Sequence, residues 1–115
     1  MKLPNREKAY VQPQKLTGYL LSLDHSVGKS KAKFFREVGF NENNIDLLER
    51  ELLDLAQFQE VCESSSSSHG SKYVIVGPIN TPVNKAVTIL TVWIIDSGAT
   101  NPRFITARPF RKGEL

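Results

Sequence analysis

The spacing of apolar residues changes near residue 57, and this change constrains the fold more than any other feature of the chain. Before it, apolar residues recur at intervals of three and four, the spacing of helices that bury one face. After it they alternate or run together, as in the strands of an antiparallel sheet. This order predicts an α+β fold, with N-terminal helices packed on a C-terminal four-stranded antiparallel β-meander.

The first half of the chain predicts two short helices. The first is expected over about 13–23, because Pro13 lacks an N–H that would have no partner at a helix start. The second is expected over 28–38, where Ser26 can serve as the N-cap. Gly39 has the position of a C-cap residue, so the second helix should end there.

The third helix, expected over 43–56, has the clearest pattern. Asn43 can cap its N-terminus, and Asp46 in the first turn is favourable for the helix dipole. Ile45 and the leucines that follow form one wide apolar stripe, while carboxylates occupy the other face. We therefore expect this helix to pack across the sheet and to turn an acidic surface to solvent.

Four segments have the composition of strands, namely 57–63, 73–77, 86–95 and 103–108. Five serines and the following His69 and Gly70 separate the first two, and they predict a flexible loop over 64–70. Gly77 and Pro78 are expected to end the second strand. The third is apolar on both faces, which is typical of a central strand.

Length and composition favour a single domain, 1–115, with 40% hydrophobic and 23% charged residues. Residues 1–12 show no periodicity and are expected to form an extended arm. The single cysteine, Cys62, has no partner for an internal disulfide, which favours a reducing compartment. No apolar stretch is long enough to cross a bilayer or resembles a signal peptide, so the expectation is a cytoplasmic protein without a membrane segment.

Charge is distributed in three blocks. Residues 1–36 contain eight Lys or Arg and two acids, 37–63 contain one Arg and eight acids, and 64–115 contain six Lys or Arg and two acids. The basic blocks could form a positive surface for a polyanion, with the acidic helix facing away. On charge alone, a simpler interpretation is preferred, in which each amphipathic element has a charged solvent face.

The chain lacks the residues needed for several common kinds of functional site. Gly28, Lys29 and Ser30 resemble the end of a phosphate-binding P-loop, but that motif requires a glycine where this chain has Leu23. Two histidines and one cysteine lack the spacing of a zinc site, so neither a metal nor a cofactor is expected. Cys62 has no basic neighbour that would activate it as a nucleophile.

One cluster has the residue types that metal-free RNA cleavage can use. His25 precedes a helix N-terminus, where free N–H groups favour an anion, and Lys29, Lys33 and Arg36 follow, while Lys31 points elsewhere. A histidine can transfer protons to and from the reacting oxygens, and cations can stabilise the phosphorane. A lone loop histidine is more often a surface or capping residue, and on pattern alone that interpretation is preferred.

The last strand supplies further candidates. With regular alternation, Phe104, Thr106 and Arg108 share one face and Arg103 lies on the other. Thr106 and Arg108 could then hold a phosphate together, although an edge strand with arginines at its solvated ends fits equally well. Trp93 could stack on a base, but its apolar surroundings are more typical of the core.

Several runs of the sequence resemble a family of small bacterial proteins of unknown function that is common in cyanobacteria. They are KLPNREKAYVQPQKLTGYLLSLDHSVGKSKAKFFREVGF, GSKYVIVGPI, ILTVWII and RFITARPF, and together they cover nearly the whole chain. A more distant resemblance rests on a histidine followed by K…KFF…GF and on strands ending in ITA-P. In these features the chain is similar to the barnase–EndoU–colicin–RelE group of bacterial ribonucleases.

The second resemblance implies helices against a four-stranded antiparallel sheet and RNA cleavage without metal, in many cases by toxins. It makes His25 the acid/base residue, Lys29 or Lys33 a phosphate contact, and Thr106 a residue that helps to hold the phosphate. Arg108 stands where such toxins often have an aromatic or apolar residue, so the surface of the implied site departs from the pattern.

Two main hypotheses follow. The first is a metal-independent endoribonuclease of the toxin type, with catalytic residues His25, Thr106, Arg103 and Arg108, RNA as substrate and a cognate inhibitor protein as partner. The second is a non-enzymatic or immunity-type interaction subunit that uses the acidic helix 43–56 and a sheet edge. A nucleic-acid-binding module without chemistry is a third, and the sequence leaves a homodimer open. Proximity of His25 to Thr106 and an arginine would favour the first.

Overall fold

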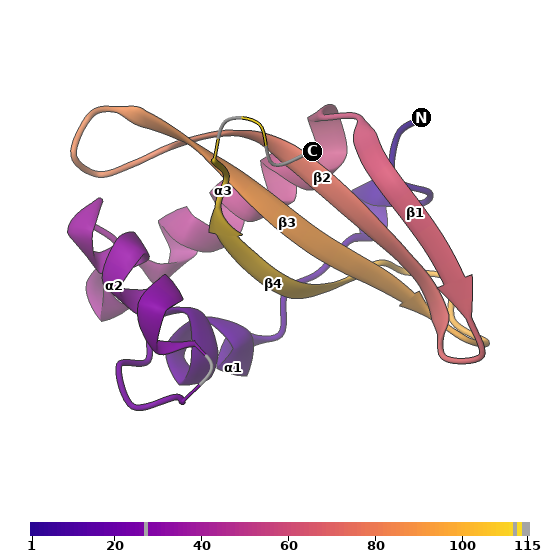
Figure 1. The fold of residues 1–115 in the computed structure, drawn as a ribbon, viewed down its shortest axis with the longest axis horizontal. Helices are drawn as coiled ribbons and strands as arrows, with labels where there is room; N and C mark the ends of the chain where they lie inside the picture. Colours follow the sequence, from indigo (N-terminus) through magenta and orange to yellow (C-terminus); the bar gives the residue numbers. More distant parts are fainter. Residues whose placement is uncertain (27, 112, 114–115) are drawn as a thin grey trace.

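The computed structural model describes residues 1–26, 28–111 and 113, and it has short helices followed by a four-stranded sheet (Figure 1). The strands are antiparallel and adjacent in sequence order, β1-β2-β3-β4. Helix α3 lies against β2, while α1 and α2 gather beside β4. The predicted α+β fold is confirmed.

The predicted first helix consists of α1 (Pro13–Lys15) and a π-helical turn, η2 (Leu16–Leu20). In this turn the N–H of Leu21 donates to the carbonyl of Leu16 at 2.8 Å. The helical segment thus starts at Pro13 as predicted but ends before residue 23. Its buried leucines hold it against the core, and the half-buried Tyr19 lies between them.

The second helix, α2 (Lys29–Glu37), agrees with the prediction over 28–38. Gly39 follows it with φ of +104°, a conformation that only glycine adopts without strain, and its N–H donates to the carbonyl of Arg36 at 3.0 Å. The predicted N-cap, Ser26, does not cap the helix, because Gly28 occupies that position.

The third helix, α3 (Ile45–Phe58), is preceded by a 3-10 turn, η3 (Glu42–Asn44). The capping residue is Asn41 rather than Asn43: the Asn41 side chain accepts from the N–H of Asn43 at 2.8 Å, and the Asn44 side chain accepts from the N–H of Asn41 at 2.8 Å. This reciprocal capping box satisfies the N–H groups at the start of the helical segment.

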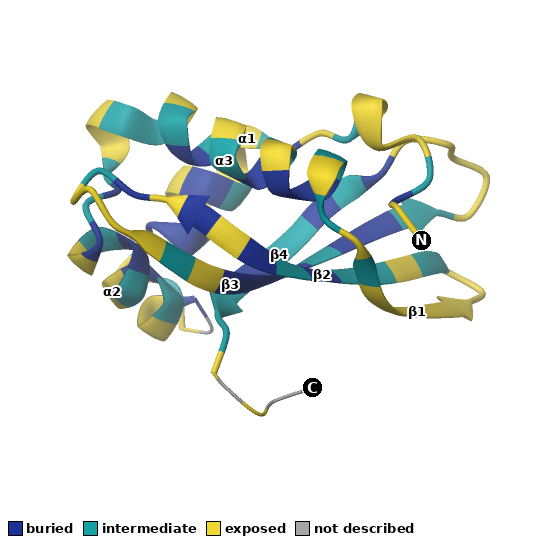
Figure 2. Ribbon diagram, turned by 90° about the horizontal axis from the view of Figure 1, so that it is seen from above, coloured by how far each residue is buried: buried dark blue, intermediate teal, exposed yellow. Residues whose placement is uncertain are grey.

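The four strands are β1 (Val61–Ser67), β2 (Gly70–Asn80), β3 (Ala86–Asp96) and β4 (Arg103–Pro109). Figure 2 shows that helices cover one face of the sheet, and that β1 is exposed along most of its length. The core lies between α3 and this face, where Trp93, Phe104 and Ile75 are completely buried. Among the described residues, no helix has the length and apolar character needed to span a membrane.

The serine run departs from the prediction. The first four serines belong to β1 and pair one to one with β2, so that Ser64 lies opposite Tyr73 and Ser67 opposite Gly70. Only Ser68 and His69 remain in the turn. The predicted flexible loop over 64–70 is therefore wrong, because hairpin pairing outweighs the modest strand propensity of serine.

Strand β2 continues through Pro78, where the sequence predicted its end. Pro78 lies opposite Thr88 of β3, whereas β1 pairs with β2 no further than Ile75. Among the described strands, β2 is therefore hydrogen-bonded only to β3 in this region, and a proline without an N–H is tolerated on such a locally unpaired side.

A β-bulge in β4 changes which residues share a face. The register with β3 shifts by one residue at Ile105. As a result, Phe104 and Ala107 are both completely buried in the core although three positions separate them. The regular alternation predicted for this strand, which put Phe104 on one face with Thr106 and Arg108, is wrong.

The N-terminal arm predicted over 1–12 is extended apart from one 3-10 turn, η1 (Arg6–Lys8), and it is packed against the domain. Leu3 and Val11 belong to the core cluster. Tyr10 forms a parallel bridge to Arg103 at the edge of β4. The arm therefore contributes to the core and covers part of one sheet edge.

Candidate functional site

Tyr19 is at the centre of the candidate site, between the helices and the last strand. Its hydroxyl lies 2.9 Å from Oγ1 of Thr106, a contact that joins η2 to β4. Its ring packs edge-on against the imidazole of His25, with the ring centroids 5.0 Å apart. The fold thus brings His25 and Thr106 to the same place, with Tyr19 between them.

The start of α2 orients the imidazole of His25. The N–H of Gly28 donates to Nδ1 at 3.0 Å, and the N–H of Lys29 donates to the His25 carbonyl at 2.9 Å. Because Nδ1 accepts a hydrogen bond, the neutral ring carries its proton on Nε2. His25 therefore replaces the predicted Ser26 in satisfying the helix start, and in this arrangement Nε2 is a hydrogen-bond donor.

Two ammonium groups lie over the Tyr19 ring. The Nζ atoms of Lys15 and Lys31 are 5.2 Å and 5.6 Å from its centroid. Partial burial acts to raise the pKa of the Tyr19 hydroxyl, but the hydrogen bond with Thr106 and the positive charges of Lys31 and Lys15 outweigh it. The pKa is lowered from its ordinary value of 10.0. Tyr19 is therefore a tyrosine whose anionic form is stabilised by its surroundings.

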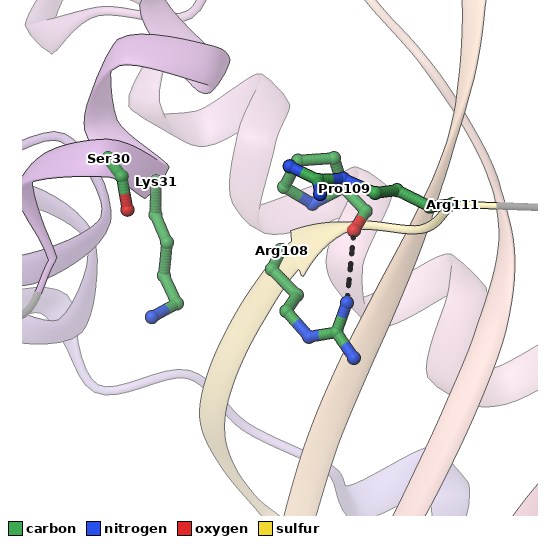
Figure 3. Close-up of a pocket in the computed structure, with 5 residues that line it drawn as sticks. All are labelled: Ser30, Lys31, Arg108, Pro109 and Arg111. Carbon is green, nitrogen blue, oxygen red and sulfur yellow. Dashed lines mark hydrogen bonds between the residues drawn. The ribbon is translucent and has the colours of Figure 1, made fainter. Parts of the chain in front are cut away.

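An open pocket of about 350 Å³ adjoins this cluster (Figure 3). Ser30 and Lys31 of α2 form one wall, and Arg108, Pro109 and Arg111, from the end of β4 and just beyond it, form the other. The described lining residues include three cationic side chains and no acidic one. Such a pocket is suited to a phosphate group, because planar guanidinium and ammonium groups both bind phosphate oxygens.

Lys31 connects the pocket with Tyr19, because its side chain lines the pocket and its Nζ lies over the Tyr19 ring. Thr106 approaches Tyr19 from β4, two positions before Arg108. The pocket and Tyr19 are therefore connected through Lys31 on α2 and through β4. Within the described part of the chain, no group of three or more His, Cys, Asp or Glu side chains has the arrangement of a metal site.

Two predicted site residues have other contacts. The Arg103 guanidinium forms a two-point ion pair with Asp96, at 2.9 and 3.0 Å, toward the end of β4 remote from the pocket. Arg36 donates to the carbonyl of Leu21 at 2.6 and 2.9 Å and pairs with Glu42. Both arginines therefore hold segments of the fold together, and the structure does not bring them to Tyr19.

The lysine of α2 that lines the pocket is not one of those predicted to contact phosphate. Lys29 and Lys33, the predicted phosphate contacts, are exposed, whereas Lys31 is half-buried and lines the pocket. Tyr19 was also missed, because its spacing from Leu16 and Leu20 is typical of a core residue. The signal that could have found it is its position in a helix that also carries Lys15, shortly before His25.

A titration can test the electrostatic origin of the Tyr19 shift. Lys31→Met removes the larger of the two charge effects on Tyr19 while keeping a side chain of similar length, and we expect the pKa of Tyr19 to rise. The measurement is the ultraviolet absorbance of tyrosinate against pH, with Tyr19→Phe identifying the contribution of this tyrosine among three. Lys33→Met, which changes an exposed lysine of the same helix, should leave the curve unchanged.

Gly28 is needed for the close approach of α2 to Tyr19. A Cβ atom at position 28 would lie 2.8 Å from the carbonyl oxygen of Tyr19 and 3.1 Å from its ring. Gly28→Ala should therefore displace Tyr19 and lower the free energy of unfolding by about 1–3 kcal/mol. Gly18→Ala is the matched control, because a Cβ there meets nothing within 4 Å and alanine favours the helix. Denaturant unfolding of both variants measures the difference, and equal stability would contradict it.

The fold is similar to that of a chain in the structure of a contact-dependent growth inhibition toxin–immunity protein complex from Klebsiella pneumoniae 342. The TM-score is 0.70 at 16% sequence identity, over 88% of this chain and 99% of that one. At this level of identity the likeness concerns the fold alone.

The sequence comparisons give a family but no curated relative. No curated protein matches the chain. A family model described as a domain of unknown function (DUF6883) matches residues 2–111. Since this match covers nearly the whole chain, the protein belongs to that family.

Proposed function

We propose that this protein is a metal-independent endoribonuclease of the bacterial toxin type. The observation that carries the proposal is the cationic pocket formed by Lys31 and Arg108 beside Tyr19, whose pKa is lowered. A group able to exchange protons next to a phosphate-sized positive pocket is the arrangement that RNA cleavage without metal requires.

Cleavage would proceed through the ribose 2′-hydroxyl. The 2′-oxygen attacks the neighbouring phosphorus as it loses its proton, and the bond from phosphorus to the 5′-oxygen breaks as that oxygen gains one. The products are an RNA fragment with a 2′,3′-cyclic phosphate and a fragment with a free 5′-hydroxyl. Negative charge accumulates on the phosphorane, and Lys31 and Arg108 would stabilise it.

Tyr19 is the group that we assign to proton transfer. Its anionic form, favoured by the hydrogen bond with Thr106 and by Lys31, would take the 2′-proton. The Lys31 ammonium would then supply the proton for the leaving oxygen, and Tyr19 would return one to Lys31 afterwards. This exchange restores the starting protonation states of both groups.

His25 has a different role in this scheme from the acid/base role expected from the sequence. Transfer of a proton at Nε2 would require the bond from Gly28 to Nδ1 to break. With that bond intact, His25 would orient Tyr19 and donate from Nε2 to a phosphate oxygen. His25→Asn, whose Oδ1 can accept from Gly28 in the same position, should therefore retain more activity than His25→Ala.

The proposal includes a protein partner. The structure with the similar fold contains a toxin and its immunity protein. A nuclease of this type would be harmful to the cell that makes it unless an inhibitor blocked the site. We therefore propose a cognate inhibitor that covers the pocket and presents carboxylates to Lys31 and Arg108.

The test is incubation of the purified protein with total RNA in EDTA. We expect cleavage that leaves 2′,3′-cyclic phosphate ends, and a loss of at least about tenfold in Arg108→Ala. An exposed-site control, Lys85→Ala, should cleave normally. Absence of cleavage would overturn the proposal and favour a non-enzymatic interaction subunit.

A further inference from the structure

Strand β1 leaves the sheet with one open edge. Over Ser64–Ser67 it pairs with β2 on one side, and no described residue pairs with it on the other. The opposite edge is covered, because Tyr10 exchanges backbone hydrogen bonds with Pro102 and Phe104 at 3.0 Å and Tyr19 contacts Thr106. An open edge of this kind can pair with another strand.

The N-terminal residues of the chain already pair with the beginning of this edge. The N–H of Val61 donates to the carbonyl of Met1 at 2.7 Å, and Lys2 forms an antiparallel bridge with Glu60. This contact shows that the N–H of Val61 points away from β2. Since directions alternate along a strand and the bulge before Glu63 adds one residue, the peptide groups of Ser64 and Ser66 also point to the open side.

The edge beyond the bulge is regularly paired and has no charged residue over Ser64–Ser67. Ser64–Ser67 pair with β2 without interruption, and their side chains are exposed and small. A second strand can therefore approach to hydrogen-bonding distance without displacing bulky side chains. The charged, bulky residues that usually protect an exposed edge are missing from this stretch.

We propose that this edge is occupied by β1 of a second copy of the chain, in a two-fold dimer with one continuous sheet. Antiparallel pairing with Ser65 on the axis places Ser64 of each copy opposite Ser66 of the other. This register uses all the open peptide groups of the two serines. Glu63 then lies opposite the neutral Ser67 of the second copy, so that no like charges face each other.

The dimer would leave the candidate site accessible. β1 and β4 are the two opposite edges of the sheet, and the pocket of Lys31 and Arg108 lies at the β4 end. Dimerisation and RNA cleavage are therefore independent, and either can be absent without the other. Because the paired segment is short, we expect a reversible dimer with a dissociation constant on the order of 100 µM.

Analytical ultracentrifugation of the full chain across that concentration range tests the proposal. We expect a monomer–dimer equilibrium that Ser66→Pro abolishes, because proline removes an outward N–H while the pairing of β1 with β2 is kept. Ser66→Ala keeps the N–H and should dimerise normally. Circular dichroism should show the same fold in both variants. A monomer at every concentration, or a dimer that Ser66→Pro does not affect, would overturn the proposal.

Cross-linking tests the register without depending on the proline variant. In a Cys62→Ser background, Ser65→Cys places one thiol of each copy next to the two-fold axis. Residue 65 forms no hydrogen bonds between the two copies, and at such a pair the Cα atoms are about 4.5 Å apart. The Ser65→Cys protein should form a disulfide-linked dimer on oxidation. Ser67→Cys, which lies opposite Glu63 of the second copy, should cross-link at least about tenfold more slowly. Equal rates would exclude this pairing.

Discussion

Tyr19→Phe should reduce RNA cleavage by at least about 100-fold while the protein remains folded, because the substitution removes only the hydroxyl that exchanges the proton. The ring would still pack against His25 and still receive Lys15 and Lys31 over its face. The hydrogen bond with Thr106 would be lost, which should lower the free energy of unfolding by only about 0.5–1.5 kcal/mol. Initial rates on a fluorogenic RNA in EDTA measure the effect.

The pH dependence separates a chemical role of Tyr19 from a structural one. If the anionic form accepts the 2′-proton, the rate of the natural protein should rise with pH through the lowered pKa of Tyr19. Lys31→Met, which also removes the proton donor for the leaving oxygen, should lower the rate and move its rise to higher pH, since the pKa of Tyr19 rises. Tyr10→Phe, which alters an exposed tyrosine on the arm, is the matched control and should keep the normal profile. A Tyr19→Phe protein with unchanged rates would remove Tyr19 from the mechanism.

Trp93→Ala should have the largest effect on stability. Trp93 is completely buried, packs edge-on against Phe104 with ring centroids 5.3 Å apart, and donates from Nε1 to Oγ1 of Thr91 at 2.9 Å. Its removal leaves a cavity at the centre of the core, and we expect the free energy of unfolding to fall by about 3–5 kcal/mol. This is a large part of the stability of a typical domain.

The measurement is denaturant unfolding followed by circular dichroism, because Trp93 is the chain's single tryptophan and its removal abolishes the fluorescence signal. Val92→Ala is the comparison, since Val92 precedes Trp93 on the same strand but is only half-buried. We expect the free energy of unfolding of Val92→Ala to fall by about 1 kcal/mol. Similar losses in the two variants would show that the core is not centred on Trp93.

The order of the elements was predictable from the sequence, because burial of one face fixes a local spacing of apolar residues. The leucine stripe of α3, the largely apolar sequence of β3 and Gly39 after α2 each reflect a need of one segment alone. The capping residues and the strand limits were less predictable. His25 rather than Ser26 satisfies the start of α2, and the serines of β1 form a strand because β2 is available as a partner.

The candidate site was predictable only in part. The sequence marked His25, Thr106 and Arg108, since their residue types suggest proton transfer and phosphate binding. It excluded Lys31 because Lys29 and Lys33 share a helix face, whereas the structure turns the Lys31 face of α2 toward the pocket. It assigned Arg103 to the site, but Asp96 holds that guanidinium at the other end of β4.

The sequence by itself determined the α+β fold and the order of helices and strands, because these depend on periodicities within single segments. Only the tertiary structure decided that Tyr19 joins His25 to Thr106. That junction depends on the bulge at Ile105, on the short π-helical turn and on the close approach at Gly28. The bulge and the π-helical turn are local irregularities, and the approach at Gly28 is a contact between different segments. Irregularities and contacts of this kind produce no periodic pattern in the sequence.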